Sequence, residues 1–176
     1  MSTSVFIRNQ QRTYAINVRY LRWMTRELLQ ELLWIENFDL GIYLVRAPKM
    51  AQINQTYLQH EGSTDVITFD YSEAPAVKSR IGNSKSEVNL HGELFICIDE
   101  AIAQARQFRT TWQSELVRYV IHGVLHLCGY DDLNPAARRV MKREETRLLH
   151  KLKLNFPPAK LAGPGRASLK SPPTKR

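Results

Sequence analysis

The amino-acid sequence predicts a single α+β domain, a small mixed β-sheet of about four strands covered by about five helices. The length of 176 residues suits one domain, and a hydrophobic content of 43% is enough for one substantial core. Segments rich in β-branched and aromatic residues alternate with segments whose apolar residues recur every three or four positions. Such alternation is typical of a sheet covered by helices, although it does not give the order of the strands.

The first half of the chain is expected to contain three strands and two helices. The first helix is assigned because its apolar residues recur three or four positions apart with charged residues between them. Pro48 suits the first turn of the second helix. In chain order the elements are a strand at 4–9, a helix at 17–35, a strand at 38–46, a helix from Pro48 to about 59 and a strand at 65–71.

The second half is expected to begin with a loop and to end in three helices. Thr110 and Gln113 have capping-box spacing before one helix, and Asn134 followed by Pro135 suits the start of the last. In chain order the elements are a loop at 72–90, a strand at 93–99 and helices at 100–108, 111–127 and 135–151.

The net charge of +8 is concentrated at the C-terminus. Seven of the 25 Lys and Arg residues lie from Lys151 onward, where no Asp or Glu occurs, which leaves 18 basic against 17 acidic residues before it. The last residues are rich in Pro, Gly, Ser and Ala. We therefore expect a domain at 1–153 and a disordered basic tail at 154–176, which either contacts phosphates non-specifically or is merely solvated.

The sequence also points to a cytosolic protein without disulfides. No apolar run approaches the roughly 20 residues that span a bilayer, and the N-terminus lacks the pattern of a signal peptide. The two cysteines, Cys97 and Cys128, both lie in apolar segments, where a free thiol usually packs as a small hydrophobe.

A candidate metal site lies in the segment IHGVLHLCGYDDLN, residues 121–134. His122 and His126 are four residues apart, so both imidazoles lie on the same face of a helix. Gly129 can adopt the positive φ that ends a helix and turns the chain back over its last turn. Asp131 or Asp132 can then supply the third ligand of a catalytic zinc with one open position. Cys128 is a competing ligand, but it lies nearly opposite His126 on the helix.

Three segments together resemble the YbeY-type rRNA endoribonucleases. HGVLHLCGYDD matches the family signature HGxLHLxGYDH except at its last position, and INQTYLQHEGSTDVITFDY and HGELFICID resemble two further family segments. The resemblance runs from about residue 5 to 150. It implies one Zn²⁺ per chain, held by His122, His126 and Asp132, with aspartate in place of the family's usual histidine.

The resemblance further implies a single-strand-specific, zinc-dependent endoribonuclease. Its expected role is 3′-end maturation of small-subunit (16S) rRNA and ribosome quality control in the cytoplasm. Its expected partners are rRNA, the ribosome or the pre-ribosomal small subunit, with neither DNA nor a membrane involved. Leu58 departs from the family, because it occupies a position where an arginine is usual.

Four further residues are candidates for the surroundings of the metal. Asp131 is expected to accept the free N–H of a liganding imidazole and so to fix its tautomer. Thr64 and Asp65 are expected to line the site if their strand lies beside the histidine helix. Glu93 is a candidate general base.

Two alternatives to the ribonuclease stay open from the sequence. A zinc metalloprotease would use the helix pattern HExxH, but Gly123 stands at the glutamate position, so Glu93 would have to serve as the base. A non-catalytic, zinc-stabilised module that docks on the ribosome would have closed coordination, with Cys128 as a fourth ligand.

Overall fold

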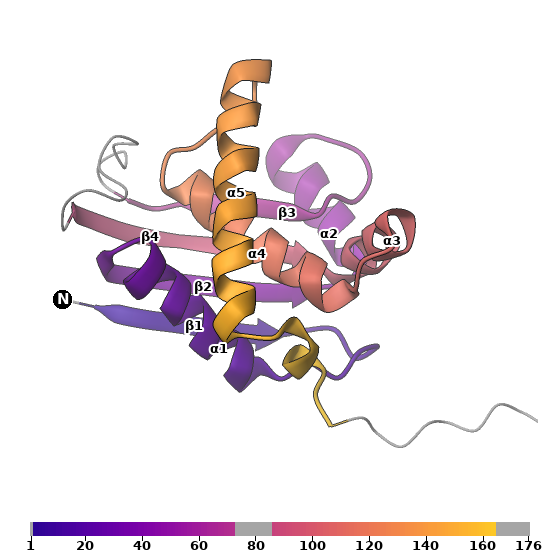
Figure 1. Cartoon of the computed structure of the whole chain (residues 1–176). Helices are drawn as coiled ribbons and strands as arrows, with labels where there is room; N and C mark the ends of the chain where they lie inside the picture. Colours follow the sequence, from indigo (N-terminus) through magenta and orange to yellow (C-terminus); the bar gives the residue numbers. More distant parts are fainter. Residues whose placement is uncertain (1, 73–85, 165–176) are drawn as a thin grey trace, which may run out of the picture.

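The computed structural model describes residues 2–72 and 86–164, and it confirms the predicted α+β fold (Figure 1). Two helices continue into short π-helical segments, η1 after α1 and η2 after α2. The elements are β1 (Thr3–Asn9), α1 (Val18–Glu27), η1 (Leu28–Leu32), β2 (Ile35–Val45), α2 (Ala47–Ile53), η2 (Asn54–Leu58), β3 (Val66–Asp70), β4 (Ser86–Cys97), α3 (Ile98–Phe108), α4 (Trp112–Leu127), α5 (Pro135–Asn155) and the 3₁₀ helix η4 (Pro158–Leu161).

The four strands form one mixed sheet in the order β1-β2-β4-β3. β2 pairs in parallel with both β1 and β4, whereas β3 runs antiparallel to β4. Of the expected loop at 72–90, residues 73–85 lie outside the described residues. Its end is wrong, because β4 already begins at Ser86 and Leu90 pairs with Phe38 of β2. This early part of β4 is defined by pairing with a strand distant in sequence, which local composition does not reveal.

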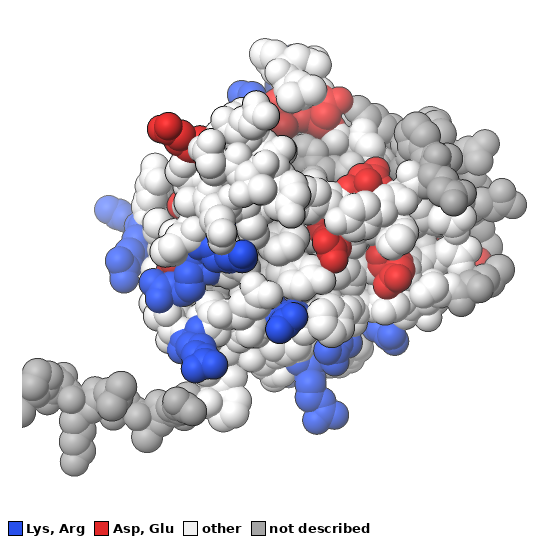
Figure 2. Space-filling view, turned by 180° about the vertical axis from the view of Figure 1, so that it is seen from behind, with Lys and Arg blue, Asp and Glu red and all other residues white. Residues whose placement is uncertain are grey.

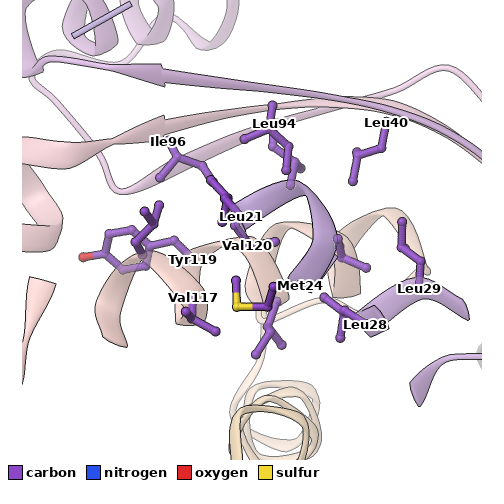
Figure 3. Close-up of a cluster of buried hydrophobic side chains, with 14 of the residues drawn as sticks. Leu21, Met24, Leu28, Leu29, Leu40, Leu94, Ile96, Val117, Tyr119 and Val120 are labelled. Atoms are coloured by element: carbon purple, nitrogen blue, oxygen red, sulfur yellow. The ribbon is translucent and has the colours of Figure 1, made fainter. Parts of the chain in front are cut away.

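The helices cover the two faces of the sheet unequally. α1, α4 and α5 lie over one face, where the main core forms (Figure 1; Figure 3). A Cβ at Gly123 of α4 would lie 2.7 Å from Leu94 Cδ2 of β4, so glycine permits the close approach of helix and sheet. α2 packs on the opposite face through a smaller cluster that includes Met50 and Ile53. Seen from behind, Lys and Arg side chains gather toward the lower part and Asp and Glu toward the upper and right parts (Figure 2).

The helix starts agree with the predicted cap at one position and differ at the other. The side-chain oxygen of Asn134 accepts from the N–H of Ala137 at 2.9 Å, as expected for the cap of α5. α4 is capped by Thr111, not Thr110, because the Thr111 hydroxyl accepts from the N–H of Ser114 at 3.2 Å. The cap lies one residue later than the sequence pattern suggested.

The folded domain continues past the predicted boundary at residue 153. α5 runs to Asn155, and the two apolar side chains Phe156 and Leu161 are buried. The N–H of Asn17 donates to the carbonyl of Leu161 at 2.8 Å, which ties this segment to the start of α1. The composition of the segment concealed these apolar anchors; the rest of the expected tail, 165–176, lies outside the described residues.

Candidate metal centre

α4 places two imidazoles side by side at its C-terminal end. His122 and His126 lie one turn apart on the same helix face, and their Nε2 atoms are 3.1 Å apart. The two rings are arranged edge to face, with centroids 4.6 Å apart. Both side chains are partly buried, so their nitrogens are shielded from bulk water but still reachable.

The chain after α4 folds back because of Gly129, which has the predicted positive φ of 83°. The N–H of Gly129 donates to the carbonyl of His126 at 2.9 Å, and that of Tyr130 donates to Leu125 at 3.0 Å. These two bonds form a Schellman motif, which satisfies carbonyls at the helix end and reverses the chain direction. This reversal brings Asp132 close to the histidine pair.

His122, His126 and Asp132 form a group whose candidate ligand atoms all lie within 4.8 Å of one another. Two zinc–nitrogen bonds of about 2.0–2.1 Å at a tetrahedral angle would separate the nitrogens by about 3.3 Å. The observed Nε2 separation of 3.1 Å is close to that value. Arg138 donates to the carbonyl of Asp132 at 3.1 Å and so holds the returning loop in place. The donor set of two imidazoles and one carboxylate therefore fits a divalent ion.

The Nδ1 atoms of both imidazoles already have hydrogen-bond partners. His122 Nδ1 lies 3.1 Å from the Glu145 carboxylate, and His126 Nδ1 lies 3.1 Å from the carbonyl of Tyr130. Both partners are acceptors, so a neutral imidazole at either position donates from Nδ1 and keeps on Nε2 a lone pair that can bind a metal. The expected role of Asp131 is thus taken by other groups, and its Oδ1 instead accepts from the N–H of Leu133 at 3.4 Å.

Glu145 belongs to a network that the sequence analysis missed. Its other oxygen accepts from Arg118 Nη1 at 2.9 Å, and Arg118 Nε lies 3.4 Å from Glu115. Glu145 is only 8% exposed although it is ionisable. The signal in the sequence was its position four residues after Met141 on the apolar stripe of the last helix, where a charged residue needs a partner.

Burial and these contacts set the charges of the site. Burial raises the pKa of Glu145, but His122 and Arg118 outweigh it and leave the pKa below its usual 4.5. Burial lowers the pKa of His122, yet the hydrogen bond and charge of Glu145 bring it above 6.5. For His126, burial and the neighbouring His122 both lower the pKa. Glu145 is therefore a carboxylate and His126 a neutral imidazole at neutral pH.

A pocket with a volume of about 440 Å³ opens over this group. Its lining includes His122, Asp132 and Glu145, and the cations Arg118, Arg138 and Lys142. The volume lies within the range of sites that bind small ligands. Two of the three candidate ligands, His122 and Asp132, therefore face a pocket that a substrate can enter.

Asp65 lines this pocket, as expected, at the start of β3. Its Oδ1 accepts from the N–H of Val66 at 2.9 Å and from the hydroxyl of Thr64 at 3.0 Å. Thr64 thus orients Asp65, but it is not among the residues that line the pocket.

Glu93 does not line the pocket. Its neighbour Gly92 faces Leu127 of α4, so Glu93 points to the opposite face of the sheet. There its carboxylate accepts from the hydroxyls of Tyr43 at 2.9 Å and Tyr71 at 3.0 Å. Because side chains alternate between the two faces along β4, Glu93 lies away from the candidate metal and does not take the expected role of general base.

Two other residues singled out by sequence also lie away from the candidate ligands. Cys128 is fully buried in the main core, and burial raises the pKa of its thiol to about 12. Leu58 ends η2 with 46% of its surface exposed, and it does not line the pocket.

Comparison with known proteins gives one family. The sequence model described as Endoribonuclease YbeY matches residues 6–153. A relative of that name from Parabacteroides distasonis is 40% identical over 111 residues, which are 63% of this chain and 69% of the relative. One from Bacteroides fragilis is 41% identical over 101 residues, 57% of this chain and 63% of the relative. One from Flavobacterium psychrophilum is 33% identical over 135 residues, 77% and 84% of the two chains.

A solved structure shares the fold. The solution structure of TM1509 from Thermotoga maritima superposes with a TM-score of 0.59, covering 98% of this chain and 100% of that one. The two sequences are 22% identical, so this likeness concerns the fold alone.

Proposed function

The chain belongs to the YbeY endoribonuclease family, and from this premise we propose that it is a zinc-dependent endoribonuclease specific for single-stranded RNA. Its proposed role is 3′-end maturation of 16S rRNA and ribosome quality control in the cytoplasm, with the small ribosomal subunit as partner. Among the helices of the described residues, none is long and apolar enough to cross a membrane. The observation that carries the proposal is the convergence of His122, His126 and Asp132, of which His122 and Asp132 line an open pocket.

The side chains around the pocket have separate tasks in this proposal. His122, His126 and Asp132 hold the ion, and Glu145 fixes His122 with its Nε2 lone pair directed at the ion. When bound, zinc supplies Lewis acidity toward a phosphodiester and its attacking water.

The cations that line the pocket provide attraction for the RNA backbone. Arg138 and Lys142 lie on α5 at the side of Asp132, and Arg118 lies on α4. Arg118 is already paired with Glu145 and Glu115, so its charge is largely balanced. Arg138 and Lys142 are therefore the proposed phosphate contacts in a chain that has Leu58 where the family usually has arginine.

The positions of Gly123 and Glu93 argue against a metalloprotease. At Gly123, the position of the HExxH glutamate, an added Cβ would lie 2.7 Å from Leu94, so no general base fits there. Glu93, the substitute base, lies on the opposite face of the sheet. Neither position offers a carboxylate to a water at the candidate metal.

A closed structural zinc site is disfavoured by Cys128. Its side chain packs in the main core and does not belong to the group that His122, His126 and Asp132 form among the described residues. With three protein ligands and a pocket above them, the arrangement resembles a catalytic site with an open position more than a closed one.

The test is metal content by elemental analysis, together with cleavage of a structured rRNA fragment, for the wild type, Asp132→Ala and the matched control Asp131→Ala. We expect near one zinc per chain in the wild type, loss of zinc and cleavage in Asp132→Ala, and retention of both in the control. Full zinc content in Asp132→Ala would remove Asp132 as a ligand. A zinc-loaded wild type that leaves RNA intact would refute the ribonuclease and favour the docking module.

A further inference from the structure

Tyr119 carries a buried hydroxyl that lacks a hydrogen-bond partner within the described part of the chain. The side chain lies on α4, three residues before His122, and only 4% of the residue is exposed. Burying a hydroxyl without a partner is unfavourable, and most buried polar groups in proteins are satisfied. An unsatisfied hydroxyl beside a candidate catalytic site therefore suggests that a ligand supplies the partner.

Tyr119 lines the pocket of the candidate metal centre, and its hydroxyl lies at the margin of the core. Figure 3 shows its oxygen at the outer end of the ring, turned away from Val117, Val120 and the other apolar side chains of the core. Tyr119, Asp65 and His122 all line the same pocket. Tyr119 and His122 share one face of α4 because they are three residues apart.

Asp65 brings a fixed acceptor to the same place. Its Oδ1 is held by the N–H of Val66 at 2.9 Å and by the hydroxyl of Thr64 at 3.0 Å. The carboxylate therefore keeps one orientation at the start of β3. The pocket thus combines a hydroxyl that needs a partner with an anchored carboxylate that can only accept.

We propose that Tyr119 and Asp65 form a ribose-binding subsite that recognises the 2′-hydroxyl of the nucleotide bound at the candidate metal centre. The 2′-hydroxyl donates its proton to Asp65 and accepts from the Tyr119 hydroxyl. This inference rests on the proposed ribonuclease function and identifies the residues that would distinguish RNA from DNA.

A neutral sugar hydroxyl suits this subsite better than a phosphate. Asp65 lines the pocket, and its carboxylate would repel a phosphate but can accept from a neutral hydroxyl. Burial, followed by the negative charges of Asp65 and Glu115, raises the pKa of Tyr119, so its hydroxyl stays protonated and able to donate at neutral pH. A 2′-hydroxyl can use a donor and an acceptor at once, which an aromatic base edge or a phosphate oxygen cannot do with one atom.

The test compares zinc-loaded, full-length wild type with Tyr119→Phe. Three kinds of single-stranded oligonucleotide of one sequence serve as substrates: all-RNA, a series of RNAs with one 2′-deoxy nucleotide at each position in turn, and all-DNA. Cleavage is measured as kcat/KM, and binding as Kd by fluorescence anisotropy. In the wild type, one deoxy position should lower kcat/KM or raise Kd by roughly 5-fold, the worth of about one neutral hydrogen bond. In Tyr119→Phe the same deoxy substitution should have little effect, because the all-RNA oligonucleotide already lacks that bond.

The matched control is Tyr20→Phe, which removes a hydroxyl bonded to the carbonyl of Pro157, outside the pocket. It should keep the wild-type response to the deoxy position. If Tyr119→Phe also keeps that response, water satisfies the hydroxyl and the subsite is refuted. If neither protein cleaves RNA but the deoxy effect on binding disappears in Tyr119→Phe alone, the subsite stands and the proposed ribonuclease activity fails.

Discussion

Replacing Glu145 by glutamine should weaken zinc binding, although Glu145 is not one of the candidate ligands. The two carboxylate oxygens serve two donors, His122 Nδ1 at 3.1 Å and Arg118 Nη1 at 2.9 Å. A glutamine of the same size has one acceptor oxygen, so its amide N–H₂ must face one of these donors. If it faces His122, the imidazole proton moves to Nε2 and blocks the lone pair needed for the metal.

The expected loss follows from those two contacts. A hydrogen bond to a charged group contributes about 1.5–3 kcal/mol, and removal of a partner that orients a metal-binding histidine typically lowers metal affinity about 10–100-fold. We therefore expect the zinc Kd of Glu145→Gln, measured by competition with a chromogenic chelator, to rise about 10–100-fold. Glu144→Gln is the control, because Glu144 pairs with Arg147 instead. Wild-type affinity in Glu145→Gln would show that Glu145 does not orient His122.

Two further predictions concern stability. Burial raises the pKa of Asp99, but hydrogen bonds from Ala47 and Arg46 outweigh it and hold the pKa below its usual 3.8. Asp99→Asn should therefore lower the free energy of unfolding in urea by about 1–2 kcal/mol at pH 7. The difference in unfolding free energy between wild type and variant should shrink as the pH falls below 3.8, because the wild type then loses this contribution. A difference that stays constant down to pH 2 would contradict the prediction. Gly129→Ala should lower the free energy of unfolding by about 1–2 kcal/mol because of its φ of 83°, and it should also weaken zinc binding. Gly62→Ala, at φ 86° with open space around it, should lower only the melting temperature. Equal zinc affinities in the two variants would show that the turn at Gly129 does not position Asp132.

Local patterns in the sequence predicted the elements well where side-chain periodicity or turn chemistry sets them. The apolar spacing of 17–35 predicted α1 and η1, which end at Leu32, three residues before the expected end, and the cap at Asn134 was found as predicted. The pattern of two histidines, a glycine and two aspartates predicted the reversal at Gly129, which depends on interactions within a few residues. The early part of β4 was missed because its pairing with β2 is non-local.

The sequence by itself determined the fold class, the helix that carries His122 and His126, and the family, because these depend on residue periodicity and on a motif contained in one segment. Only the tertiary structure decided that Glu145 orients His122, that Asp65 and Tyr119 share the pocket and that Glu93 lies on the opposite face. The physical reason is that these relations join side chains from different elements. Strand order and the packing of α5 on α4 set them, and neither is encoded in the spacing of residues along one segment.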